Sequence, residues 1–97
     1  MENEYLKKLK ELVLTALGEE KVKIVVFGSR ARGDSNLYSD VDIGIIPYGK
    51  INKTKLVLLK EKVEDLNIPY KVEIVNFTEV SKAFKKEALK EAIVWKD

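Results

Sequence analysis

Two apolar runs rich in β-branched residues constrain the fold of this chain most strongly. The first covers residues 22–27 and ends at Gly28, and the second begins at Asp40 and continues to residue 46. Runs of this length and composition predict buried strands. Because successive side chains of a strand alternate between its faces, we expect Asp40 and Asp42 on one face and the apolar side chains of Val41, Ile43 and Ile45 on the other.

The segment after the first run predicts a phosphate-binding turn. Gly28 has no side chain, so backbone there can approach a bulky ligand. Ser29 stands where a short helix through Ala31 would begin, and its hydroxyl and the free N–H groups of that first turn can donate to an anion. Arg30 and Arg32 add positive charge nearby, although arginines in an exposed turn are often only solvated.

The two aspartates of the second run predict a Mg²⁺ site. Two carboxylates on one face repel each other unless a cation lies between them. Mg²⁺ prefers oxygen ligands and usually binds one or two carboxylates together with substrate phosphates, which the Gly28-Ser29 turn would supply. Either feature alone has a plain alternative, an ordinary turn or a solvated acid. The aspartates follow Ser29 after a gap of ten residues, and together the two features favour a functional interpretation.

The rest of the chain predicts three more helices and two more strands. Residues 70–76 alternate as a strand, and residues 93–95 form a short final one. The order of elements predicts one α/β (α+β) domain over residues 1–97, with a small mixed sheet covered by helices. The helical spacing involves Tyr5, Leu9, Leu12, Val13 and Ala16 before Gly18; Leu56, Leu59, Val63 and Leu66 after a cap at Asn52; and Val80, Phe84 and Ala88 after Thr78.

Glu73 in the third strand is a further candidate for the site. Val72 and Ile74 take one face of that strand, which leaves Glu73 on the other with Lys71. If this strand neighbours the one that begins at Asp40, three carboxylates would converge on a two-metal site, and one of them could accept a proton. Glu73 is equally well explained as a surface charge that deters strand pairing or pairs with Lys71.

Composition excludes several other classes of site. The chain has 97 residues, no cysteine and no histidine, so thiolate nucleophiles, imidazole bases and cysteine-ligated zinc are ruled out. The net charge of +2 favours no nucleic-acid partner, and a basic face at Lys82, Lys85, Lys86 and Lys90 is typical of a solvated helix. No run approaches the roughly 18 apolar residues of a membrane span, so we expect a cytoplasmic protein that does not enter a membrane.

These residues resemble the signature of the minimal nucleotidyltransferases, a family of the DNA polymerase β-like nucleotidyltransferase superfamily. The signature is Gly-Ser, a ten-residue gap and Asp-x-Asp, which Gly28, Ser29, Asp40 and Asp42 match. The resemblance implies a polymerase β palm-like fold, phosphates of ATP or another nucleotide at the Gly-Ser pair, and Mg²⁺ on the two aspartates. At the third carboxylate position the family usually has aspartate, so Glu73 departs from its pattern.

The resemblance also implies a partner. Single-domain members of this family resemble antitoxins that silence a HEPN ribonuclease toxin by transferring AMP to one of its tyrosines. A domain of this size has little room for two substrates, so we expect a partner protein or self-association to complete the acceptor site. Two alternatives remain open: a catalytically weak or inactive module that neutralises its partner by occlusion, and a regulator that binds nucleotide without turnover.

Overall fold

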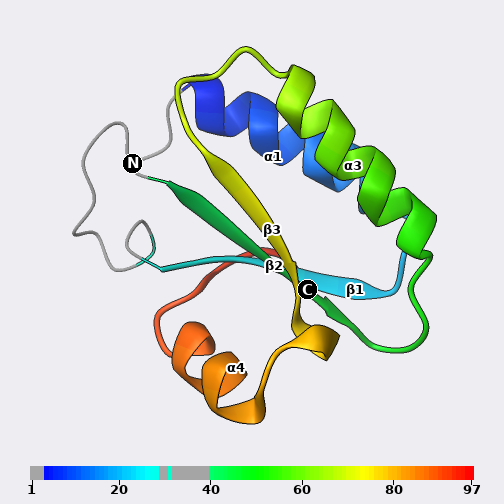
Figure 1. Ribbon diagram of the computed structural model, residues 1–97, viewed down its shortest axis with the longest axis vertical. Coiled ribbons are helices and arrows are strands. Elements are labelled where there is room, and N and C mark those ends of the chain that lie inside the picture. The colour runs from blue at the N-terminus through cyan, green and yellow to red at the C-terminus, as the bar shows by residue number, and fades with distance from the viewer. Residues whose placement is uncertain (1–3, 29–30, 32–39) are drawn as a thin grey trace.

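A four-stranded mixed sheet forms the centre of the molecule in the computed structural model, which describes residues 4–28, 31 and 40–97 (Figure 1). The strands lie in the order β3-β2-β1-β4. β1 pairs antiparallel with β2 and with β4, whereas β2 and β3 are parallel. Their bounds are Val22–Phe27 for β1, Val41–Pro47 for β2, Val72–Asn76 for β3 and Ile93–Lys96 for β4. All four predicted strands are therefore present, with the mixed pairing that was expected.

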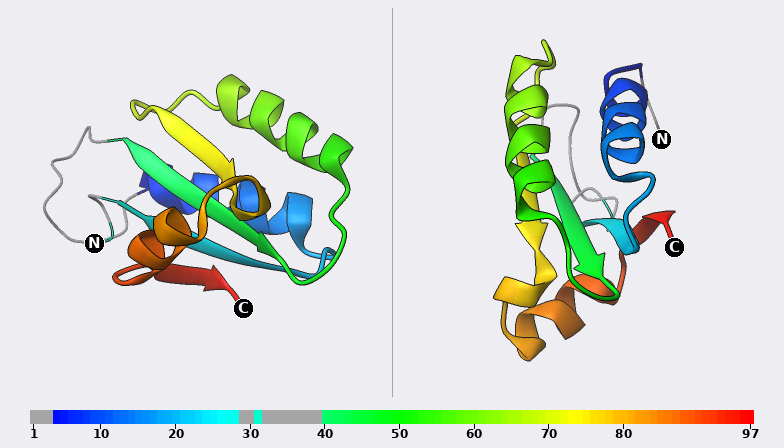
Figure 2. Two further views of the ribbon diagram at one scale, coloured as in Figure 1. Left: turned by 60° about the horizontal axis from the view of Figure 1, so that its bottom comes forward. Right: turned by 90° about the vertical axis from the view of Figure 1, so that its right-hand side faces the viewer.

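Two helices cover one face of this sheet and form the main core with it. α1 (Glu4–Leu17) and α3 (Lys53–Asp65) lie side by side there, and Figure 2 shows α4 beyond the opposite face. Side chains that alternate along β1 and β2 point toward α1 and α3, as the strand period requires. The most deeply buried members of this core are Leu9, Val13, Leu17, Ile24, Val41, Ile43, Ile45 and Leu59.

Local signals account for the ends and faces of these two helices. The Asn52 side chain accepts hydrogen bonds from the backbone N–H groups of Thr54 and Lys55, which confirms the predicted cap of α3. The buried residues of α1 are Leu6, Leu9, Val13 and Leu17. Tyr5, which shares the helical spacing, lies at the edge of this buried face: its side chain is 43% exposed, and its ring contacts Tyr70 edge-to-face.

The opposite face carries a smaller core, centred on Phe77. This residue begins a short 3₁₀ turn, η1 (Phe77–Glu79). The Phe77 ring packs closely over Gly44, and a Cβ added to Gly44 would lie 2.7 Å from that ring. Glycine in β2 thus makes room for an aromatic side chain from the next element. The buried members of this second core are Val25, Phe27, Ile46 and Phe77.

The last helix differs most from the sequence prediction. α4 (Lys82–Leu89) is capped by Ser81, not by Thr78, whose hydroxyl donates to the Asn76 side chain within the 3₁₀ turn. None of its residues is buried, and Phe84, which was expected to point inward, is 44% exposed. β4 follows as predicted. No helix in the described part of the chain is long and apolar enough to cross a membrane.

Candidate functional site

Asp42 lies at the centre of a row of three side chains that crosses three strands. Asp42, in β2, is paired across the sheet with Phe27 of β1 on one side and with Glu73 of β3 on the other. Directly paired residues project from the same face of a sheet, so this row lies on the face opposite α1 and α3. The predicted neighbourhood of the second and third strands is confirmed, and Asp42 and Glu73 occupy paired positions on adjacent strands, whose backbones lie about 4.8 Å apart.

Asp40 precedes β2 instead of belonging to it. The strand begins at Val41, and Asp40 is exposed just outside it. The predicted alternation holds from there on, because Val41, Ile43 and Ile45 are buried in the main core whereas Asp42 is half-buried on the other face. Asp42 is therefore held at a position within β2, whereas Asp40 is attached just before the first residue of that strand.

The electrostatic environment of Asp42 is unfavourable to its charge. Burial raises the pKa of Asp42 above its ordinary value, and the negative charges of Glu73 and Asp40 raise the pKa further. Asp40 and Glu73 are thus both close enough to act on Asp42. Glu73 has one opposite charge beside it, since Lys71 Nζ lies 3.5 Å from its Oε1 in an exposed ion pair. The expected alternative partner of Glu73 is therefore also present.

Gly28 joins the predicted phosphate turn to this row. It follows Phe27 directly and has a φ of +80°, a backbone conformation that residues other than glycine rarely adopt. A Cβ placed on Gly28 would lie 2.5 Å from the Asp42 carboxylate oxygen Oδ2. The absent side chain thus leaves backbone and carboxylate in direct contact. The other predicted phosphate ligands, Ser29, Arg30 and Arg32, lie outside the described residues.

The donor set fits a magnesium ion only in part. Within residues 4–28, 31 and 40–97, no group of three or more acidic, histidine or cysteine side chains is arranged to hold a metal ion. The expected convergence of Asp40, Asp42 and Glu73 on one point is therefore not formed. Mg²⁺ needs only one or two protein carboxylates when phosphates supply the other ligands, and a cation would relieve the repulsion that raises the pKa of Asp42. The carboxylate oxygens of Asp40 and Asp42 therefore fit Mg²⁺ when phosphates supply the remaining ligands.

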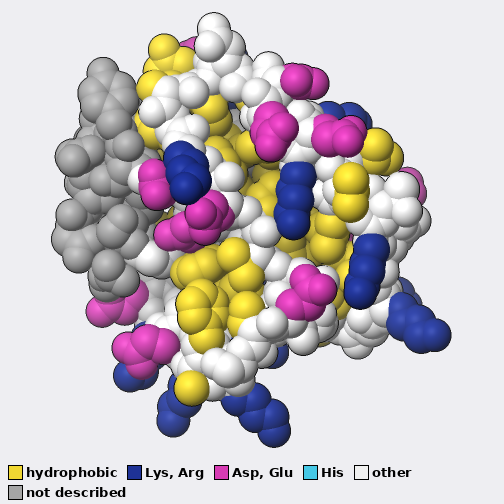
Figure 3. Space-filling model, viewed as in Figure 1, with side chains coloured by type: hydrophobic (Ala, Val, Ile, Leu, Met, Phe, Trp, Pro, Cys, Tyr) yellow, Lys and Arg dark blue, Asp and Glu magenta, His cyan; other side chains and the backbone are white. Residues whose placement is uncertain are grey.

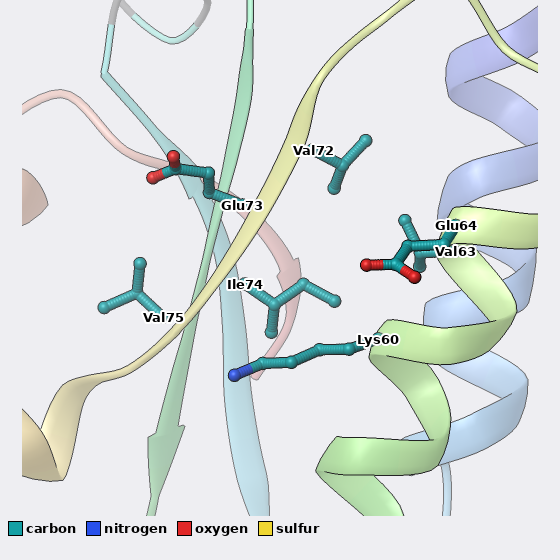
Figure 4. Close-up of a pocket in the computed structure, with 7 residues that line it drawn as sticks. All are labelled: Lys60, Val63, Glu64, Val72, Glu73, Ile74 and Val75. Atoms are coloured by element: carbon teal, nitrogen blue, oxygen red, sulfur yellow. The ribbon is translucent and has the colours of Figure 1, made fainter.

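A pocket of about 270 Å³ borders the same row at the outer edge of β3. Figure 4 shows Val72 and Ile74 pointing from β3 toward α3, and Glu73 and Val75 pointing away from it. Lys60 and Glu64 reach toward the pocket from α3. Glu73 therefore belongs both to the row with Asp42 and to the rim of this pocket.

Aromatic side chains adjoin the row at its β1 end. The chain contains three phenylalanines, and all three meet here in edge-to-face contacts. Phe27 is the member that stands next to Asp42, and Phe77 and Phe84 contact it from η1 and α4. Sequence reasoning missed this cluster because its members are 50 or more positions apart, except for Phe77 and Phe84.

Comparisons with known proteins agree with this arrangement. Residues 7–97 match the model of the family described as "Polymerase beta, Nucleotidyltransferase". MJ0126 of Methanocaldococcus jannaschii, which is named as a candidate protein adenylyltransferase, is 33% identical over 76 residues that cover 77% of this chain and 76% of that protein.

Solved structures give the same fold. The structure of a candidate minimal nucleotidyltransferase is 29% identical, with a TM-score of 0.70 over 96% of this chain and 95% of the other. A chain from a crystal structure of a toxin–antitoxin with AMP-PNP is 18% identical, with a TM-score of 0.66 over 89% of this chain and 71% of the other. The second likeness concerns the fold alone.

Proposed function

This chain belongs to the polymerase beta nucleotidyltransferase family, and we propose that it transfers AMP from ATP to a hydroxyl group of a partner protein. The observation that carries this proposal is the contact of Gly28 with Asp42, with Glu73 in register beside them. The proposed phosphate site at Gly28 thus lies beside the carboxylates of Asp42 and Glu73, which favour a bound cation. The chain is a nucleotidyltransferase, and the choice of AMP and of a protein acceptor is supported by its similarity to a protein named as an adenylyltransferase.

Gly28 and the three acidic residues each have a role in this reaction. Gly28 admits the phosphates of ATP to the backbone at the end of β1, and Asp42 with Asp40 would hold Mg²⁺ there. When bound, Mg²⁺ neutralises phosphate charge and lowers the pKa of the attacking hydroxyl. Glu73 lies next to Asp42 and is placed to accept the proton of that hydroxyl. The hydroxyl oxygen bonds to the α-phosphorus, the bond from that phosphorus to the bridging oxygen breaks, and pyrophosphate leaves.

The partner class follows from the same likenesses. We propose a HEPN-type toxin as the acceptor, so that this chain acts as the antitoxin of a toxin–antitoxin pair. Support comes from the resemblance to minimal nucleotidyltransferases and from a fold shared with a chain of a toxin–antitoxin structure. An alternative is favoured by one observation: Glu73 is paired with Lys71 and stands where aspartate is usual. In that case the chain silences its partner by occlusion, without transfer.

The deciding experiment follows labelled AMP. The purified protein is incubated with α-labelled ATP, Mg²⁺ and the protein encoded beside it, and the wild type is compared with Asp42→Asn. We expect label on the partner with the wild type, and a loss on the order of 100-fold or more with Asp42→Asn, because the central carboxylate of the metal site is removed.

A matched control makes the result specific. Asp65 is exposed at the end of α3, so Asp65→Asn makes the same chemical change away from the row and should leave labelling intact. Full activity of Asp42→Asn would contradict the proposed mechanism. A stable complex with the partner that acquires no label would instead support occlusion.

A further inference from the structure

Phe84 contacts two aromatic rings although its own ring is half-exposed. It belongs to the first turn of α4, where its backbone N–H donates to the hydroxyl oxygen of Ser81 at 3.0 Å. Its ring meets Phe27 and Phe77 edge-to-face, with centroid separations of 5.9 and 6.1 Å. The side chain nevertheless remains 44% exposed. One surface of the ring is thus fixed by aromatic contacts while the remainder is open to a ligand.

The open ring lies beside the row that contains Asp42. Phe27 is the direct cross-strand neighbour of Asp42, and Phe84 packs on Phe27. These two steps together span on the order of 10 Å. Figure 3 shows hydrophobic side chains gathered in the region of β3 and α4, next to acidic side chains. An aromatic surface and a carboxylate that would hold Mg²⁺ therefore adjoin on one face of the sheet, as a nucleotide with metal-bound phosphates and a flat apolar base would need.

We propose that Phe84 stacks on the base of the bound nucleotide. This inference rests on the proposed function, and it assigns a base-binding residue to that same site. The ribose and the α-phosphate separate the base from the reacting bond, and Phe84 is likewise separated from Asp42 by one residue, Phe27. Stacking on an aromatic side chain tolerates any base, because every base has a π-face. Phe84 then contributes to affinity for the nucleotide more than to choice among bases.

The surroundings of Phe84 suit a nucleotide better than a protein surface. A stable protein interface needs about 800 Å² from each partner, of which one half-exposed ring is a small fraction. A single open ring instead matches one flat group of a small ligand, such as a base. A nucleoside triphosphate carries one such group.

Calorimetric titration with two ligands tests the proposal. ATP and inorganic tripolyphosphate, each with Mg²⁺, are titrated into the wild type and into Phe84→Ala and Phe84→Leu. We expect the affinity for ATP to fall about tenfold or more in both variants, and the affinity for tripolyphosphate, which has no base, to stay unchanged. The Leu variant retains apolar packing on Phe27, so its result stands even where the Ala variant loses its fold.

Two further variants complete the design. Phe84→Tyr keeps the aromatic ring and should retain ATP affinity, and Val57→Ala removes a side chain that is 56% exposed on α3 and should change neither ligand. Unchanged ATP affinity in both Phe84→Ala and Phe84→Leu would overturn the proposal, as would an equal loss for ATP and tripolyphosphate. Reduced labelling of the partner at unchanged ATP affinity would likewise overturn it, and would assign Phe84 to the acceptor. A wild type that binds neither ligand would contradict the nucleotidyl-transfer function itself.

Discussion

Gly28 combines a backbone requirement with a steric one. Its φ of +80° costs about 1–2 kcal/mol for residues with a side chain. The Asp42 carboxylate takes up the space beside Gly28, because its Oδ2 lies 2.5 Å from the position that a Cβ would occupy. The two requirements affect different properties, since backbone strain lowers stability, whereas a displaced Asp42 alters the site.

We therefore predict a double effect of Gly28→Ala. The free energy of unfolding should fall by about 1–2 kcal/mol, measured by urea denaturation, because alanine disfavours the required φ. Affinity for ATP with Mg²⁺ should fall as well, because the short Asp42 side chain must rotate away from the added methyl group. Gly49→Ala is the control, since a Cβ there meets nothing within 4 Å. ATP binding as tight as in the wild type would show that the contact has no functional role.

Asp42 gives rise to a prediction about stability and pH. Its pKa in the folded protein is raised, so the native state binds this proton more tightly than the unfolded chain does. The charged carboxylate therefore lowers the free energy of unfolding at every pH above the raised value. As the pH falls through that value toward the ordinary 3.8, the cost disappears. The sign is opposite to that of a salt-bridged aspartate.

In the absence of Mg²⁺, Asp42→Asn should consequently melt at a higher temperature than the wild type at pH 7. The difference should shrink as the pH falls and vanish below pH 3.8, where Asp42 is neutral in both states. Thermal unfolding between pH 3 and 8 measures it, and Asp65→Asn shows what the same substitution does at an exposed position on α3. A wild type that is more stable than Asp42→Asn at neutral pH would refute this account.

Of the helices α1, α3 and α4, only α4 has no buried residue. None of its eight residues is buried, and it touches the smaller core through half-buried Ala88 and Leu89 and the edge of Phe84. α3 buries Leu56, Leu59 and Val63 in the main core. Regions with few buried apolar contacts open locally at low free energy. We therefore expect the helix that carries the proposed base-binding residue to open more readily than α3.

Native-state hydrogen exchange checks this at the level of elements. We expect the amides of α4 to exchange at least about tenfold faster than the protected amides of α3, because opening α4 exposes little apolar surface. ATP with Mg²⁺ should slow exchange in α4 if its base stacks on Phe84. Equal protection of α4 and α3 in the free protein would contradict the assignment of α4 as the weak element.

At the scale of the whole molecule, the two faces of the sheet have different tasks. The face toward α1 and α3 holds the main core, to which all four strands contribute apolar side chains. The other face has only the smaller core, which ends at the row formed by Phe27, Asp42 and Glu73. Because one face supplies most of the buried area, the other can carry charged and half-exposed groups at moderate cost.

Much of this arrangement could be predicted from local patterns. The strands at residues 22–27 and 41–47 were evident from apolar runs, the helix after Asn52 from its cap, and the orientation of Asp42 from alternation with its buried neighbours. The α4 region was predicted poorly. Val80, Phe84 and Ala88 have helical spacing, but Thr78 is held by Asn76 in a 3₁₀ turn, and the helix starts only after Ser81.

The sequence by itself determined the strands, the faces of their side chains and the signature that Gly28, Asp40 and Asp42 share with the nucleotidyltransferases. These are local properties, because period, turn chemistry and motif spacing are set within a few residues. Tertiary structure alone decided that Glu73 lies in register with Asp42 and that Gly28 contacts the Asp42 carboxylate. It also decided that the three phenylalanines meet beside Asp42. Those contacts join residues far apart in the chain, and only the pairing of strands and the packing of the sheet bring them together.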